Sequence, residues 1–234
     1  MNLALQTQLG LTKAPVAIGF LDEPPAGIAP WNSGAVPAGC VFWRAAWEGR
    51  SFYTVPSDHF NCAVGAYTHA MPIPADRGNV LMETIGFMVG SGYLQMEEVP
   101  GIPVLPKTPA FVAYAPAEEA TFTPDVVLIA ATPGSAMLIY EAAVRAGAGN
   151  ALTQTLGRPG CAVLPLSTGT GLSALSFGCK GNRTFTGLPE QELYLAIPGA
   201  KWAAVVAAAT DILAANCTMG AHYQSHQDTI LGNQ

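Results

Sequence analysis

The sequence predicts an α/β protein of mixed α+β layers, folded as a single compact domain. Short apolar runs typical of buried strands alternate with longer helical patterns, and the clearest strand lies at 125–131. Interleaved strands and helices favour a layered fold. A chain of 234 residues also buries roughly 70% of its unfolded surface, so no disulfide or metal is needed to hold the fold.

The first half of the chain is predicted to begin with an amphipathic helix and a buried strand. Turn residues such as Pro24 and Pro25 end that strand, and Gly49 and Pro72 stop later helices. The expected elements are a helix at 3–11, a strand at 15–21, a loop at 24–39, a helix at 42–48, a strand at 52–55, and helices at 61–70 and 80–89.

In the second half, strands are predicted at 110–115, 125–131, 172–177 and 193–197, with helices at 133–145 and 200–215. Thr132 caps the first of these helices and Pro133 starts it, because the missing proline N–H has no partner at that position. Each half holds a strand, a helix and a cysteine pair about twenty residues apart, which suggests two similar fused halves. The expected domain spans 1–217, with a polar C-terminal tail at 218–234.

Charge is scarce in this chain: 11% of residues are charged and the formal net charge is −6. No basic stripe exists, which argues against nucleic acid and anionic membranes as partners. The apolar run at 202–215 is shorter than the ~20 residues of a membrane span. The N-terminus lacks a signal-peptide pattern, so we expect a cytoplasmic protein. Few charges on so apolar a chain also suggest a homo-oligomer.

Four of the five cysteines stand where a thiolate would be stabilised. Cys40, Cys62 and Cys161 precede predicted helices, where free N–H groups favour negative charge, and Cys179 ends a strand beside two cations. Four such thiolates suit an iron–sulfur cluster or a tetrahedral zinc site. The alternative is that they are small buried packing residues, which is also the expectation for Cys217.

Four further residues near these cysteines are candidates for the same site. His59 lies three residues before Cys62, and His69 lies two helical turns after it. Either is expected to act as a ligand or proton donor, unless a backbone carbonyl engages it. Lys180 and Arg183 flank Cys179 and are expected to lower its pKa or hold an anionic group, unless they are surface charges.

Two other motifs are weaker evidence for a functional site. His222 and His226 have the i, i+4 spacing of a helical metal site but lie in the polar tail and lack a catalytic Glu. The glycine-rich run at 167–172 lacks the lysine of a phosphate-binding loop and is expected to be a turn.

Several segments together resemble a known family. They are Pro15-Val16-Ala17, Gly49-x-x-Phe52-Tyr53, Asp58-x-x-x-Cys62-x-x-Gly65, Pro124-Asp125-Val126-Val127-Leu128, Pro133-x-x-Ala136-Met137, Gly178-Cys179-x-Gly181-x-Arg183 and Glu192-Leu193-x-x-x-Ile197-Pro198. The chain resembles domain of unknown function 169 (ArCR) over about residues 10–215. The resemblance implies cysteine at the four positions above and brings no activity with it. Ala63 and Asn182 stand where many members have Pro and Ser, which puts a shared substrate in doubt.

The leading hypothesis is therefore an iron–sulfur protein, of the 4Fe-4S kind, with its cluster held by Cys40, Cys62, Cys161 and Cys179. Its role would be redox chemistry or electron transfer with a small-molecule substrate or a redox partner. The expected cofactor-binding residues also include His59, His69, Lys180, Asn182 and Arg183. Two alternatives stay open: a metal-free enzyme that uses Cys62 or Cys179 as a thiolate nucleophile, and a module that binds zinc, another metal or a tetrapyrrole. Whether the protein is an enzyme is left open.

Overall fold

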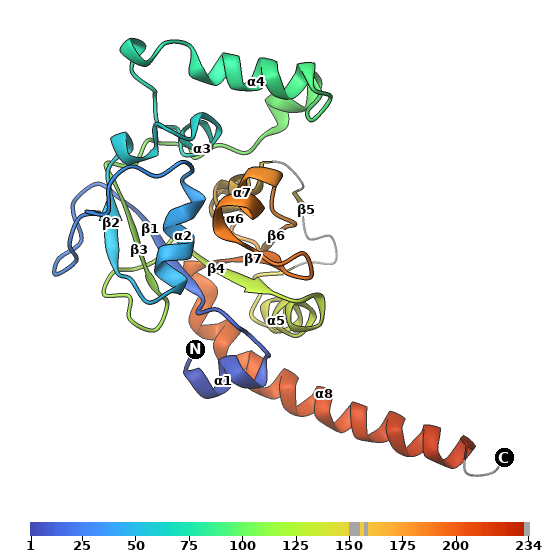
Figure 1. The fold of residues 1–234 in the computed structure, drawn as a ribbon. Helices are drawn as coiled ribbons and strands as arrows, with labels where there is room; N and C mark the ends of the chain where they lie inside the picture. Colours follow the sequence, from blue (N-terminus) through green and yellow to red (C-terminus); the bar gives the residue numbers. More distant parts are fainter. Residues whose placement is uncertain (150–154, 157–158, 232–234) are drawn as a thin grey trace.

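One mixed sheet organises the molecule. The computed structural model describes residues 1–149, 155–156 and 159–231. Within these residues seven strands pair in the order β2-β3-β1-β4-β7-β6-β5 (Figure 1). All neighbours are antiparallel except the edge strand β5, which is parallel to β6. The strands are β1 (Val16–Leu21), β2 (Phe52–Thr54), β3 (Phe111–Pro116), β4 (Val126–Ala131), β5 (Thr155–Leu156), β6 (Ala174–Ser176) and β7 (Leu193–Pro198).

Helices cover both faces of the sheet, which confirms the predicted layered α/β class. Alternate residues of a strand point to opposite faces, so Val126 and Leu128 of β4 pack in one core while Val127 and Ile129 pack in the other. Every residue of β4 is buried. The first face carries α2 (Cys40–Trp47), α3 (Ala63–Thr68), α6 (Val163–Thr170) and α7 (Lys180–Thr186), and the second carries α1 (Leu3–Gln8), α5 (Pro133–Arg145) and α8 (Trp202–Leu231) (Figure 1).

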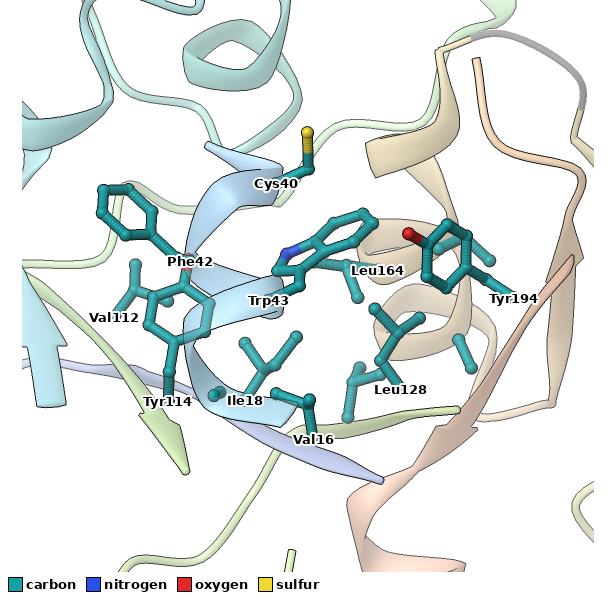
Figure 2. Close-up of a cluster of buried hydrophobic side chains, with 14 of the residues drawn as sticks. Val16, Ile18, Cys40, Phe42, Trp43, Val112, Tyr114, Leu128, Leu164 and Tyr194 are labelled. Carbon is teal, nitrogen blue, oxygen red and sulfur yellow. The ribbon is translucent and has the colours of Figure 1, made fainter. Parts of the chain in front are cut away.

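Trp43 of α2 is the centre of the first core. Figure 2 shows its indole between α2 and the side chains of Leu164 and Tyr194. Its ring meets that of Tyr194 edge-on, with centroids 5.3 Å apart and planes at 80°. Full burial of such side chains contributes roughly 2–3 kcal/mol each. In the same view Cys40, one helical turn earlier, points its sulfur away from this cluster (Figure 2).

The strand order repeats about the centre of the sheet. β1 and β4 lie side by side, β3 and β7 flank them, and β2 and β6 come next. In the first half the chain runs from Cys40 through α2 and β2 to Cys62 and α3. In the second it runs from Cys161 through α6 and β6 to Cys179 and α7. The two halves thus place their cysteines at equivalent points, each immediately before or at a helix start.

Most predicted elements are present, but the end of the last helix was predicted wrongly. α8 continues past residue 215 to Leu231, because no proline or left-handed glycine interrupts it there. Only its first half is anchored, through Val205, Ala209 and Ile212 in the second core. By length and composition alone, Gly199–Gln227 is the one described helix long and apolar enough to cross a membrane. The sequence argument against a membrane span took the apolar run to end at residue 215, but the helix continues beyond it. That the protein has no membrane partner stays a prediction.

Short helices make most of the remaining connections. Cys179, expected at the end of a strand, is instead the N-cap of α7, which begins at Lys180. Outside the two layers, α4 (Val80–Gly90) lies beyond α3, away from the sheet (Figure 1). The 3₁₀ turns are η1 (Pro56–His59), η2 (Ala75–Arg77), η3 (Met96–Gly101), η4 (Gly160–Ala162) and η5 (Gly199–Lys201).

Candidate functional site

The four predicted cysteines line one pocket on the first face of the sheet. Cys40 is the first residue of α2, and Cys62 and Cys179 are the N-caps of α3 and α7. Cys161 lies in η4, directly before α6. Four helix starts that are distant in sequence therefore meet at this pocket, and each brings a cysteine to its wall.

The pocket has a volume of about 210 Å³ and an uncharged wall. Among the described residues that line it, none is lysine, arginine, aspartate or glutamate. Aromatic and aliphatic groups supply most of the remaining surface, including Trp43, Tyr114, Phe185, Met88 and Val64. The chemistry of the wall is that of a small hydrophobic cavity with a few polar atoms.

The sulfurs of Cys179 and Cys161 accept hydrogen bonds, one from the helix that Cys179 caps and one from α3. Asn182 donates its backbone N–H to the sulfur of Cys179 over 3.4 Å, as an N-cap acceptor does. The Thr68 hydroxyl donates to the sulfur of Cys161, also over 3.4 Å. A Cβ at Gly65 would lie only 2.8 Å from the sulfur of Cys62, so glycine is needed there for the sulfur to approach the helix backbone.

Burial keeps these thiols protonated. It raises the pKa of Cys40 to about 12, and the neighbouring Cys62 and Cys179 add to the rise. Burial also raises the pKa of Cys62, against backbone N–H groups of Gly39 and Gly65 that lower it. The pKa of Cys161 is raised well above its ordinary value by burial and by Cys62. At neutral pH these three thiols are neutral.

The predicted iron–sulfur cluster is wrong for this geometry. Within the residues that the structure describes, no three His, Cys, Asp or Glu side chains form a group that could hold a metal ion. The four cysteines line one pocket wall, but among the described residues they do not come together as a metal-binding group. The redox and electron-transfer role depended on the cluster and falls with it.

The alternative hypotheses for the cysteines have different outcomes. A zinc or other metal site fails for the same reason as the cluster. A thiolate nucleophile at Cys62 is opposed by the raised pKa of that thiol, and a nucleophile at Cys179 stays a prediction. A bound tetrapyrrole stays a prediction.

His59 and His69, both expected near Cys62, lie side by side in the pocket wall. Burial lowers the pKa of His59 to about 3, with the neighbouring His69 adding to the effect, and lowers that of His69 to about 4. His59 Nε2 lies 2.8 Å from the Thr54 hydroxyl, which itself donates to the carbonyl of Val112. Both rings are therefore neutral at pH 7.

The three polar residues that follow Cys179 have different roles: one is exposed, one ties elements of the fold together, and one lines the pocket. Lys180 is exposed, and neither it nor Arg183 lines the pocket. The Arg183 guanidinium donates to the carbonyls of Phe177, Pro189 and Glu192, which ties α7 to the approach to β7. Asn182 is buried and does line the pocket.

Several pocket residues were not anticipated from the sequence. Trp43 and Tyr114 looked like ordinary core residues of a helix and a strand, and nothing local marks them as pocket wall. Thr84 and Met88 come from α4, and only the tertiary position of that helix brings them to the pocket. Cys217, by contrast, lies exposed on α8, just past the buried first half of that helix, so the packing role expected for it is wrong.

Comparisons with known proteins give one result. The model of the family described as uncharacterised ArCR, DUF169, matches residues 4–208. No curated protein and no solved structure matches the chain. The matched residues include all four pocket cysteines, both pocket histidines and Asn182, and they end within the first quarter of α8. The chain belongs to the uncharacterised ArCR family, DUF169.

Proposed function

We propose that this protein is a binding module for a small neutral molecule, which it holds in the cysteine-lined pocket. The observation that carries the proposal is the uncharged wall of that pocket. Ligand sites in proteins are concave and mostly apolar, with a small number of polar groups that fix orientation. The wall described above has this composition.

Electrostatics restrict the ligand to neutral species. The thiols of Cys40, Cys62 and Cys161 are protonated, and the rings of His59 and His69 are neutral. A charged ligand would lose its hydration without meeting an opposite charge, which costs several kcal/mol. A neutral ligand avoids this penalty and gains from apolar contact.

The volume of the pocket restricts the ligand further. An engineered cavity of about 150 Å³ accommodates benzene, and this pocket has about 210 Å³. The ligand is therefore about one substituted ring in size. The cysteines suit such a ligand, since a protonated thiol behaves as a small polarizable apolar group with a weak donor.

One wall of the pocket is a loosely packed segment. Thr84 and Met88 of α4 face the cavity, while Phe87 on the same helix is 77% exposed. After α4, the hydroxyl of Tyr93 accepts a hydrogen bond from the backbone N–H of Lys180 at the start of α7, over 2.9 Å. The helix over the pocket thus keeps most of its own side chains exposed or half-buried, which favours α4 as the side from which a ligand enters.

The test is the binding of toluene, a neutral one-ring probe, by isothermal titration calorimetry. Gly181 lines the pocket in α7, and the nearest atom to a Cβ there is 3.9 Å away. Gly181→Leu should fill the cavity and lower affinity at least tenfold. Gly169→Leu is the matched control, because Gly169 is a helical, exposed glycine with nothing within 4 Å of a Cβ. No binding by the wild type, or equal binding by both variants, would refute the proposal.

A further inference from the structure

Two buried polar side chains in the pocket wall lack partners. His69 is 4% exposed and Asn182 is 3% exposed. Among the described residues, nothing hydrogen-bonds to Nε2 of His69 or to either amide atom of Asn182. Buried polar atoms in folded proteins are nearly always paired, so such exceptions call for an explanation. Both side chains line the same cavity, and a ligand there would pair them.

The free atom of His69 is a hydrogen-bond acceptor. Its Nδ1 lies 2.8 Å from the carbonyl oxygen of Gly65. Because a carbonyl only accepts, Nδ1 must carry the proton of this neutral ring. Nε2 is then unprotonated, and its lone pair has no donor among the described residues. A ligand that satisfies it must present an N–H or O–H group.

The amide of Asn182 offers both a donor and an acceptor. It lies beside the Cys40 thiol and the Tyr194 hydroxyl, close enough to offset part of the rise in the pKa of each, but aligned for a hydrogen bond with neither. Its backbone is occupied separately, since its carbonyl accepts from the Thr186 hydroxyl over 2.8 Å. The side-chain amide thus has no hydrogen-bond partner among the described residues.

We propose that the ligand carries a neutral carboxamide or lactam group, recognised by Asn182 and His69. This deepens the proposed function and rests on it. An amide N–H supplies the donor that His69 Nε2 requires, and adjacent N–H and C=O groups complement the Asn182 amide. A carboxylate of the same shape offers no donor to His69 and would bring a negative charge into an uncharged wall. The specificity comes from leaving these buried atoms unpaired when the wrong ligand binds.

The experiment compares three one-ring probes on the full chain by isothermal titration calorimetry at pH 7. They are benzamide, which has the amide; benzoate, which replaces it with a carboxylate; and toluene, which has neither. We expect benzamide to bind at least tenfold more tightly than toluene or benzoate. Preference for benzoate, or equal affinity for benzamide and toluene, would overturn the amide proposal.

Asn182→Leu isolates the recognition. It keeps the approximate size and removes buried polar atoms that the fold does not use, so the free protein should be no less stable by thermal melting. Benzamide affinity should fall about tenfold while toluene affinity is unchanged. Asn216→Leu is the matched control, because it makes the same substitution on the exposed part of α8, outside the pocket; it should leave both affinities unchanged.

The outcomes separate the two proposals. Binding of toluene with no gain for benzamide, or an equal loss of both ligands in Asn182→Leu, overturns the amide recognition and leaves the neutral pocket standing. Failure of both toluene and benzamide to bind overturns both proposals.

Discussion

The imidazole rings of His59 and His69 lie with their centroids 5.8 Å apart, tilted by 32°, and both are buried in the wall of the pocket. Two titratable rings can share this space only when both are uncharged. Their environment therefore makes the stability of the fold depend on pH.

The first prediction follows from this burial. The folded-state pKa values, about 3 for His59 and about 4 for His69, lie below the ordinary value near 6.5, so the unfolded chain takes up protons first. The stabilisation is complete above about pH 6.5 and is lost as the pH falls toward 4. Each ring contributes up to about 1.4 kcal/mol per pH unit in that window.

Urea unfolding of the wild type and of His59→Gln at pH 7, 6 and 5 measures this effect. The variant should lose less stability between pH 7 and 5 than the wild type. His222→Gln, on the exposed part of α8, should keep the wild-type dependence. Identical pH dependence in His59→Gln and the wild type would show that His59 is not held neutral.

The second prediction concerns cysteine reactivity. A thiol pKa of about 12 leaves Cys40 with roughly a thousandfold less thiolate than a cysteine with the ordinary pKa of 9.0. Iodoacetamide at pH 7.5, followed by peptide mass spectrometry, should therefore label exposed Cys217 quickly and Cys40 and Cys161 slowly. Denaturant should abolish the difference. Labelling of Cys40 as fast as Cys217 in the native protein would contradict the account of buried neutral thiols.

The third prediction tests the junction between β7 and β4. A Cβ at Gly199 would lie 1.7 Å from the carbonyl oxygen of Pro124, and that neighbour is backbone, which cannot rotate away. Gly199→Ala should cost at least about 3 kcal/mol of unfolding free energy, because the strand end must shift. Gly134→Ala in α5, where nothing lies within 4 Å, should be neutral or stabilising. A Gly199→Ala protein of wild-type stability would show that this junction is looser than described.

The fourth prediction uses two ion pairs of different burial. Lys13 and Glu192 pair at 2.5 Å with side chains only 16% and 6% exposed, whereas Lys107 and Asp22 pair at 2.6 Å with 70% and 71% exposed. Lys13→Met leaves the Glu192 carboxylate buried without its partner and should cost about 3–5 kcal/mol. Lys107→Met should change stability by less than about 1 kcal/mol. Equal effects in chemical denaturation would count against a buried role for Glu192.

Local signals were enough to predict much of this fold. The helix at 133–145 was predicted with its true ends because Thr132 caps it and Pro133 begins it. β4 was predicted from its unbroken apolar run. The start of α7 was missed because Gly178 and Gly181 resemble a turn, while the capping of this helix by the Cys179 sulfur has no common sequence signature.

The residues of the site could be predicted from the sequence better than its chemistry could. The four cysteines and two histidines were candidates for one site from the sequence, and the structure places all six in the wall of one pocket. Their protonation was not predictable, because it depends on burial, which the packing of Trp43 and Tyr114 around the pocket helps to set. The cytoplasmic location, the homo-oligomer and the absence of nucleic-acid partners stay predictions.

The central claim is that the cysteine-lined cavity takes a small neutral ligand rather than a metal. The most direct test is a crystal structure determined under xenon pressure, since xenon enters apolar cavities of this size. The account predicts a xenon atom in the pocket beside Trp43 and Phe185, absent from the same crystals of Gly181→Leu. A metal ion or cluster bound by the cysteine sulfurs at that place would contradict it.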